Sequence, residues 1–235
     1  MNIEAIFVRS AARAADLPRD GLAEIALVGR SNVGKSSLIN ALTRQRLART
    51  SAAPGKTRLA NIYRVARAGE PFYLVDLPGY GFARGKRDEI DAVTRTYFGR
   101  EGRDPARPAL VTALLLVDAR HPGLERDLET WRWLERTVER CAIAATKIDK
   151  LSRAERLRAV KTNEAAFEHP VLPVSAVTGE GLDELWKLIE RLRHPRSPRP
   201  PNPRNPALRQ AQGGLSPSKA AGTDRPDRPL PRRKS

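Results

Sequence analysis

The chain has 235 residues, of which 40% are hydrophobic and 30% are charged. This length suits one domain of ordinary size with an appendage, because single cores rarely grow beyond about 250–300 residues. The single cysteine excludes a disulfide framework and a multi-cysteine metal cluster, while a formal net charge of +16 favours a polyanion, above all nucleic acid, as the partner.

Residues 1–21 are expected to form an N-terminal extension. They lack the basic head and apolar core of a signal peptide, and nowhere does an unbroken run of about 18 apolar residues occur. We therefore expect a cytoplasmic protein that has no membrane partner.

The central part, residues 22–193, alternates short apolar runs with helical patterns. The apolar runs predict buried strands over residues 25–28, 72–75, 110–117, 141–145 and 171–174. Helices are predicted over residues 35–42, 88–98, 124–139, 153–167 and 182–192, the last with Trp186 in the core. Because parallel strands need long crossovers and are covered on both faces, this alternation predicts an α/β domain with a mostly parallel sheet.

A glycine-rich stretch follows the first of these strands, where residues 25–36 read IALVGRSNVGKS. Gly29, Gly34, Lys35 and Ser36 match the phosphate-loop pattern GxxxxGK[ST] between a strand and a helix. In this pattern backbone amides surround the β-phosphate, the lysine reaches the β- and γ-phosphates, and the serine hydroxyl binds Mg²⁺. The pattern predicts a bound nucleoside triphosphate without separating ATP from GTP.

Two segments are candidates for parts that respond to the γ-phosphate. Residues 49–58, RTSAAPGKTR, offer several hydroxyl groups, and the Pro-Gly-Lys-Thr setting favours Thr57 as the threonine that completes magnesium coordination. Asp76-Leu77-Pro78-Gly79 follows the strand 72–75, so that Asp76 can hold a magnesium-bound water and the Gly79 N–H can reach the γ-phosphate. The glycine-rich, basic residues 80–87, which include Arg84, Lys86 and Arg87, then predict a mobile switch.

The identity of the base is indicated further along the chain, where Thr146-Lys147-Ile148-Asp149 ends the strand 141–145. A carboxylate at Asp149 can accept hydrogen bonds from N1–H and the exocyclic amine of guanine, a donor pair that adenine lacks. The stem of Lys147 can lie across the base. Ser175 and Ala176 end the next strand, where a backbone N–H could contact the guanine carbonyl.

The tail, residues 194–235, contains ten prolines, ten Lys/Arg and two Asp. Such a segment cannot bury enough apolar surface to offset the entropy lost on ordering. We expect a proline-rich, basic, disordered tail.

The motifs GRSNVGKSSLINAL, PGKTR, DLPGYGFAR, TKIDKL and SAVTG, in this order, resemble the TRAFAC-class GTPases and, more narrowly, the EngB (YihA/YsxC) family of ribosome-biogenesis GTP-binding proteins. The resemblance implies a Ras-like P-loop NTPase fold with a six-stranded sheet and helices on both faces. It also implies GTP and GDP binding, Mg²⁺-dependent hydrolysis, binding to the large ribosomal subunit and its RNA, and a role in cell division and septation. On this resemblance we hypothesise that GTP presents the basic residues Arg84, Lys86 and Arg87 to ribosomal RNA and that hydrolysis withdraws them. We expect a monomer.

The same resemblance carries the family's site over residue by residue. Nucleotide contacts fall on Gly29, Arg30, Ser31, Asn32, Val33, Gly34, Lys35 and Ser36; on Gly55, Lys56, Thr57, Arg58 and Leu59; on Asp76, Leu77, Pro78 and Gly79; on Thr146, Lys147, Ile148 and Asp149; and on Ser175, Ala176 and Val177. Magnesium falls on Ser36 and Thr57. The catalytic roles fall on Lys35, Thr57, Gly79 and Asn32.

Two features bear on the rate of hydrolysis. Ras-like enzymes usually place a water-orienting glutamine after DxxG, whereas this chain has Tyr80, so we expect slow unaided turnover. Asn32 occupies the position of a cation-ligating asparagine in potassium-activated relatives, and we hypothesise that K⁺ stimulates the reaction. Two alternatives to a GTP-hydrolysing switch stay open. One is a basic RNA-binding or scaffold protein that uses GTP structurally, and the other is an ATP-dependent enzyme of the same fold.

Overall fold

A computed structural model describes residues 2–50, 59–67, 70–80, 93–94, 97–98 and 111–194. The chain divides into two units, Met1–Ser197 and Pro198–Ser235, and all of the described residues belong to the first. The expected tail, apart from His194, therefore lies outside the described residues.

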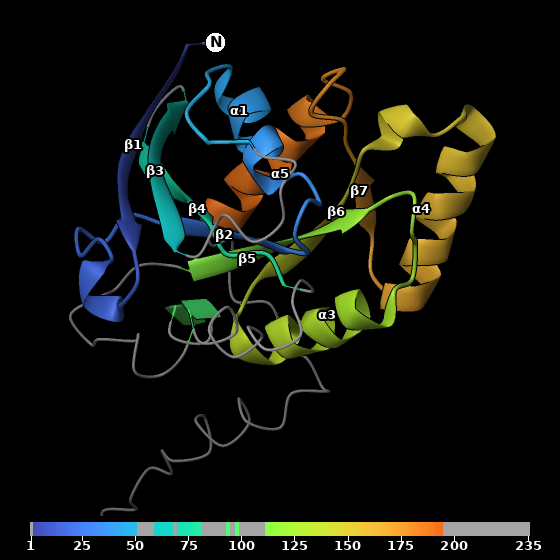
Figure 1. Ribbon diagram of the computed structural model, residues 1–235, viewed down its shortest axis with the longest axis horizontal. Coiled ribbons are helices and arrows are strands. Elements are labelled where there is room, and N and C mark those ends of the chain that lie inside the picture. The colour runs from blue at the N-terminus through green and yellow to red at the C-terminus, as the bar shows by residue number, and fades with distance from the viewer. Residues whose placement is uncertain are drawn as a thin grey trace, which may run out of the picture. The chain divides into compact units, whose positions relative to one another are not determined.

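Seven strands form one sheet in the order β1-β3-β4-β2-β5-β6-β7 (Figure 1). They are β1 (Ile3–Ala11), β2 (Glu24–Gly29), β3 (Ala60–Arg67), β4 (Pro71–Asp76), β5 (Val111–Asp118), β6 (Cys141–Thr146) and β7 (Val171–Pro173). Strands β4, β2, β5, β6 and β7 run parallel, whereas β1 and β4 each pair antiparallel with β3. The mostly parallel α/β sheet is confirmed, with one strand more than the six expected.

Two strands, β1 and β3, lie outside the five apolar runs predicted as strands, and β1 lies within the segment expected as an N-terminal extension. As an edge strand β1 buries only Ala5 and Ala11, so its sequence carries no clear apolar alternation. A bulge between Phe7 and Arg9 shifts the register with β3, and Phe7 packs edge-on against Tyr63 at 5.7 Å. Pairing with β3 holds this segment to the sheet.

The described α-helices are α1 (Lys35–Thr43), α3 (Glu125–Thr137), α4 (Arg153–Phe167) and α5 (Leu182–Arg193). Four of the five predicted helices are thereby confirmed to within two residues at each end, and the fifth, over 88–98, lies largely outside the described residues. Helices α1 and α5 cover one face of the sheet and α3 covers the other (Figure 1).

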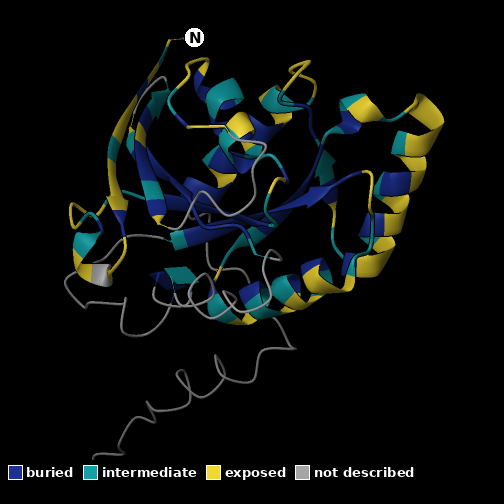
Figure 2. Cartoon of the chain, viewed as in Figure 1, coloured by how far each residue is buried: buried dark blue, intermediate teal, exposed yellow. Residues whose placement is uncertain are grey.

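The core consequently has two halves, which Figure 2 shows as buried segments on both sides of the central strands. Ile25 packs with Leu38 of α1 and with Trp186 of α5, which is 3% exposed as predicted. Val28 packs on the opposite side with Trp131 of α3. Full burial of one such side chain contributes about 1.5–3 kcal/mol, so both helix layers hold the central strands in place.

Candidate functional site

The carboxyl ends of β2, β5 and β6 bring the predicted motifs to one edge of the sheet. Gly29 ends β2 opposite Leu116 of β5, and Asp118 at the end of β5 lies opposite Thr146 of β6. Ligands of open parallel sheets bind at this edge.

The loop between β2 and α1 depends on residues that tolerate unusual backbone geometry. Gly34 has φ 111° and Asn32 has φ 61°, both in the left-handed region. A Cβ atom on Gly29 would lie 2.7 Å from the carbonyl oxygen of Leu116 and 2.9 Å from Cγ1 of Val33. The chain can therefore make this tight turn only with glycine at position 29.

Lys35 lies under the loop that precedes it. Its Nζ donates hydrogen bonds to the carbonyl oxygens of Gly29 at 2.9 Å and of Arg30 at 3.1 Å, and the residue is 7% exposed. Burial lowers the pKa of Lys35 to about 8, against the opposing effect of the Asp76 carboxylate. The loop thus encloses a cationic group among backbone atoms.

Ser36 and Asp76 lie next to each other at the base of the loop. The Ser36 hydroxyl donates a 2.7 Å hydrogen bond to Asp76 Oδ2, whereas Oδ1 of this carboxylate is buried without a hydrogen-bond partner. Burial raises the pKa of Asp76, and the Lys35 charge and the Ser36 hydrogen bond act in the opposite direction. A hydroxyl beside a carboxylate with an unused buried oxygen is a donor set that fits Mg²⁺ and its bound water.

The segment after Asp76 is joined to the phosphate loop. The Ser31 N–H donates to the carbonyl oxygen of Tyr80 and the Ser31 hydroxyl to that of Gly79, both at 3.0 Å. A Cβ on Gly79 would lie 2.6 Å from the Ser31 nitrogen, so only glycine permits this approach. The segment after Asp76 and the phosphate loop are therefore in direct contact.

The Tyr80 side chain turns to helix α3. Its hydroxyl donates to Asp127 Oδ1 at 2.8 Å, and Arg30 Nε lies 3.5 Å from the same oxygen. Burial raises the pKa of Asp127, although the Tyr80 hydrogen bond and the Arg30 charge oppose this. The residue after DxxG thus belongs to a network that ties the phosphate loop to α3.

Thr146 and Lys147 connect the phosphate loop to the strand expected to read the base. The Thr146 hydroxyl donates to the carbonyl oxygen of Val33 at 2.7 Å. Lys147 Nζ donates to the carbonyl oxygen of Asn32 at 2.5 Å and to Asp118 Oδ2 at 2.9 Å. These bonds fix the distance between the two ends of the site.

Asp149 is oriented by Ser175, a contact between the two motifs that the sequence did not predict. The buried Ser175 hydroxyl donates to Asp149 Oδ1 at 2.7 Å and accepts from the N–H groups of Val177 and Thr178. Burial alone would raise the pKa of Asp149, but the Ser175 hydrogen bond, a backbone hydrogen bond and the neighbouring Lys150 together outweigh it, so the pKa is lowered. The carboxylate is held ionised and its second oxygen lies 3.6 Å from Lys150 Nζ.

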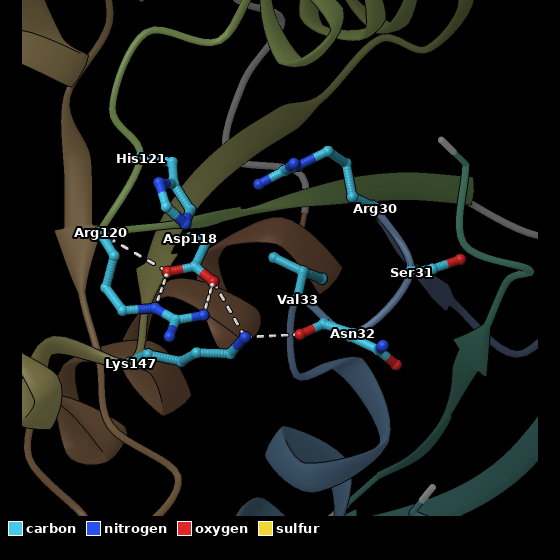
Figure 3. A pocket seen from close by; sticks show the side chains of 8 residues that line it. All are labelled: Arg30, Ser31, Asn32, Val33, Asp118, Arg120, His121 and Lys147. Carbon is cyan, nitrogen blue, oxygen red and sulfur yellow. Dashed lines mark hydrogen bonds and ion pairs between the residues drawn. The ribbon is translucent and has the colours of Figure 1, made fainter. Parts of the chain in front are cut away.

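Figure 3 shows a pocket beside the phosphate loop with side chains that sequence reasoning missed. Asp118, Arg120 and His121 line it together with Lys147. Burial raises the pKa of Asp118, but hydrogen bonds from Arg120 and Lys147 more than offset this and hold it well below its usual value. The position of Asp118 at the carboxyl end of a buried strand was the one signal that could have identified it.

The remaining predicted site residues differ in how far their side chains are buried. Leu77 and Ile148 are core side chains, whereas Ala176 is half-buried, Val177 is 78% exposed and Leu59 is 38% exposed. Gly55, Lys56, Thr57 and Arg58 lie outside the described residues, as do Arg84, Lys86 and Arg87.

Among the residues that are described, no group of three or more His, Cys, Asp or Glu is placed to hold a metal ion. No helix in the same part of the chain is both long and apolar enough to cross a membrane.

Sequence comparison identifies close relatives of this chain. The family model described as "50S ribosome-binding GTPase" matches residues 24–147. A protein of Solibacter usitatus named "Probable GTP-binding protein EngB" is 42% identical over 192 residues, which cover 80% of this chain and 95% of that protein. A protein of the same name from Anaeromyxobacter sp. (strain Fw109-5) is 43% identical over 196 residues, which cover 78% of this chain and 88% of the relative.

Structural comparison supports the same fold. A crystal structure of Era in complex with MgGDPNP and nucleotides of 16S ribosomal RNA has a TM-score of 0.61 at 24% identity, covering 77% of this chain and 60% of Era. A crystal structure of a probable GTP-binding protein engB has a TM-score of 0.55 at 24% identity, covering 72% of this chain and 98% of that one. At these identities the likeness shows a shared Ras-like fold.

Proposed function

This chain belongs to the EngB family of P-loop GTP-binding proteins, and on that premise we propose that it is a Mg²⁺-dependent GTPase acting as a nucleotide-dependent switch in assembly of the large ribosomal subunit. One observation carries the proposal most strongly: the ammonium of Lys147, which follows the end of β6 and lies two residues before Asp149, donates to the phosphate loop at Asn32. A site of fixed length with a cation at one end and an ionised carboxylate at the other suits a guanine nucleotide.

The chain's own groups account for binding at both ends. Lys35 exchanges its bonds to two backbone carbonyls for bonds to the β- and γ-phosphates, and the loop amides and the start of α1 add their dipoles. Asp149, oriented by Ser175, accepts from the guanine N1–H and amine. Gly79 lies against Ser31, where its N–H can reach a γ-phosphate.

Ser36 and Asp76 would hold Mg²⁺, directly and through a bound water respectively, and Thr57 would complete the set from the segment before β3. The ion neutralises charge on the β- and γ-phosphates when it is bound. Displacement of the Ser36 hydrogen from Asp76 is the rearrangement that this requires of the protein.

Slow unaided hydrolysis follows from the environment of Tyr80. Because the Tyr80 hydroxyl is bonded to Asp127, no side chain directly after Gly79 is available to orient the attacking water. We further propose that K⁺ near the exposed Asn32 supplies positive charge to the transition state.

The ribosomal role rests on three supports: the family model's description, the RNA bound to Era, and the net charge of +16. A ribosomal role would place the protein in the cytoplasm. The monomeric state and the link to septation are proposed from the family resemblance alone. The rival proposal, an RNA-binding scaffold that holds GTP structurally, draws its support from Tyr80.

Co-sedimentation of the full chain with purified large ribosomal subunits tests the switch. It should be run with GDP, with GTP and with a non-hydrolysable GTP analogue, while phosphate release is measured with and without subunits. We expect subunit binding that is stronger with the analogue than with GDP, and faster hydrolysis when subunits are present. Equal binding in all nucleotide states without phosphate release would favour the scaffold.

A further inference from the structure

A stretch of this chain that surrounds α1 carries positive charge without any acid. Between Glu24 and Glu70 the sequence contains no Asp or Glu but nine Lys or Arg. By contrast, the sequences of α3, α4 and α5 each mix acidic with basic residues. The segment following α1 therefore has no nearby acid in sequence to reduce its positive potential.

The turn that ends α1 has a defined shape. Arg44 adopts the left-handed conformation with φ 54°, and the N–H groups of Arg44 and Gln45 donate to the carbonyl oxygens of Ala41 and Asn40. This bonding pattern is the Schellman motif, in which glycine is the usual residue at the left-handed position. An arginine stands here at a position where its Cβ carries a steric cost.

The Asn40 side chain fixes the residues beyond this turn. Its Nδ2 donates to the carbonyl oxygen of Ala48 at 2.8 Å, and its Oδ1 accepts from the Ala48 N–H at 2.8 Å. Ala48 is 5% exposed and packs in the core, so it anchors the end of the loop. The loop 44–48 is thus held at both ends before any partner binds, which lowers the entropy cost of binding.

Three arginines project from this fixed loop and its end. Arg44, Arg46 and Arg49 are exposed, and within the described part of the chain their side chains make no hydrogen bond or ion pair. In contrast, Arg120, Arg156 and Arg193 lie within 3.6 Å of a carboxylate oxygen. The guanidinium groups of the loop keep their donors for a ligand.

The loop is separated from the candidate nucleotide site by the whole of α1. Nine helical residues, Lys35–Thr43, span about 13 Å. Variants at Arg44 and Arg46 can therefore change partner binding without touching the phosphate-binding groups.

We infer that Arg44, Arg46 and Arg49, the α1-loop arginines, form a contact surface for the phosphate backbone of structured RNA. This inference rests on the proposed function and names the surface used for it. Guanidinium groups bind phosphate oxygens in bidentate geometry. The exposed side chains of the turn are Arg44, Gln45 and Arg46, without the apolar anchor that protein interfaces need, so RNA is favoured over an acidic protein.

The test compares two triple variants of the full chain, Arg44→Gln/Arg46→Gln/Arg49→Gln and the control Arg126→Gln/Arg132→Gln/Arg136→Gln. The control removes three exposed arginines from α3, where acids alternate with them. Binding to purified large ribosomal subunits and to their naked ribosomal RNA is measured at several salt concentrations. A fluorescent GTP analogue reports the affinity for the nucleotide. Each phosphate contact contributes about 0.7–0.9 to the slope of log affinity against log salt.

We expect the α1-loop variant to bind both RNA probes at least about tenfold more weakly, with a salt slope smaller by about 2 to 3 units, and the control to change less than about threefold. GTP affinity should stay unchanged in the control and in the double variant Arg44→Gln/Arg46→Gln, which leaves Arg49 and the candidate switch segment 49–58 intact. An equal loss in both triple variants, or no loss in the first, overturns the inference. Loss with subunits but not with naked RNA would also overturn it, in favour of an acidic protein. If the unmutated chain binds neither subunits nor RNA, the proposed function fails together with this surface.

Arg44→Gly and Asn40→Ala separate charge from shape. Because glycine suits the left-handed position, Arg44→Gly should raise the melting temperature by about 2–4 °C while weakening RNA binding. Asn40→Ala keeps all three arginines but releases Ala48, and should also weaken RNA binding at an unchanged salt slope. Higher stability with full RNA affinity in Arg44→Gly would contradict a binding role for Arg44.

Discussion

The Tyr80 hydroxyl and Asp127 Oδ1 are joined by a 2.8 Å hydrogen bond, although the residues lie 47 positions apart in the chain. Asp127 is 1% exposed near the start of α3, and Arg30 of the phosphate loop approaches the same oxygen. The side chain that follows DxxG is therefore a structural link between the phosphate loop and α3.

Tyr80→Phe should lower stability and leave hydrolysis unchanged. Removing the donor leaves a buried carboxylate oxygen with only Arg30 near it, which costs about 1–3 kcal/mol of unfolding free energy. Urea unfolding measures this loss, and single-turnover hydrolysis should stay within about twofold. Tyr63→Phe is the control, because Tyr63 is buried at 2% exposure without that link. A tenfold fall in hydrolysis would show that Tyr80 acts on the attacking water.

Asp149→Asn should exchange the preference for guanine for one for xanthine. An amide cannot accept from both guanine donors, whereas its NH₂ group can donate to the xanthine carbonyl. Affinity for GTP should fall about 100-fold or more while xanthosine triphosphate becomes the better ligand in a competition assay. Asp183→Asn, an exposed change on α5, should alter neither. Retained GTP preference in Asp149→Asn would place the base elsewhere.

Ser36→Ala should remove the effect of Mg²⁺ on GTP binding. The hydroxyl that meets Asp76 is lost, so addition of a chelator should weaken GTP binding by the unmutated chain and hardly affect the variant. Ser37→Ala changes the neighbouring exposed hydroxyl and should behave like the unmutated chain. The magnesium assignment is wrong if both variants respond equally to the chelator.

Asp118→Asn should destabilise the protein in a pH-dependent way. Because hydrogen bonds from Arg120 and Lys147 hold the pKa of Asp118 below its unfolded value of about 3.8, its contribution is present in full above that pH. The contribution is lost as pH falls below 3.8 towards the folded pKa. Urea unfolding should show a loss of about 1–3 kcal/mol at pH 7 that shrinks below about pH 4. A difference that is constant from pH 7 to pH 3 would mean that Asp118 acts through packing alone.

Local sequence patterns predicted the strands and helices whose positions depend mainly on residues close together in the chain. The strand 25–28 and the helix that begins at Lys35 follow from an unbroken apolar run, a glycine turn and a helical face, and the structure has them as β2 and α1. The same holds for α4, which begins at the capping box of Ser152 and Glu155.

Long-range pairing accounts for what the sequence could not predict. β1 is stabilised by its partner β3 rather than by buried side chains of its own, so its composition gives little warning. Asp118 belongs to no short motif and acquires its role only when Lys147 approaches from the neighbouring strand. Arg44 reads as an ordinary surface arginine until its left-handed backbone and the Asn40 bonds are known.

We propose that Lys35 binds a triphosphate and Asp149 selects guanine at one edge of this sheet. Equilibrium competition against a fluorescent GTP analogue, with Mg²⁺ and purified full-length chain, tests it most directly. We expect GTP and GDP to displace the analogue, whereas ATP should not do so at about a hundredfold higher concentration. Displacement by ATP at the same concentration as GTP would contradict it.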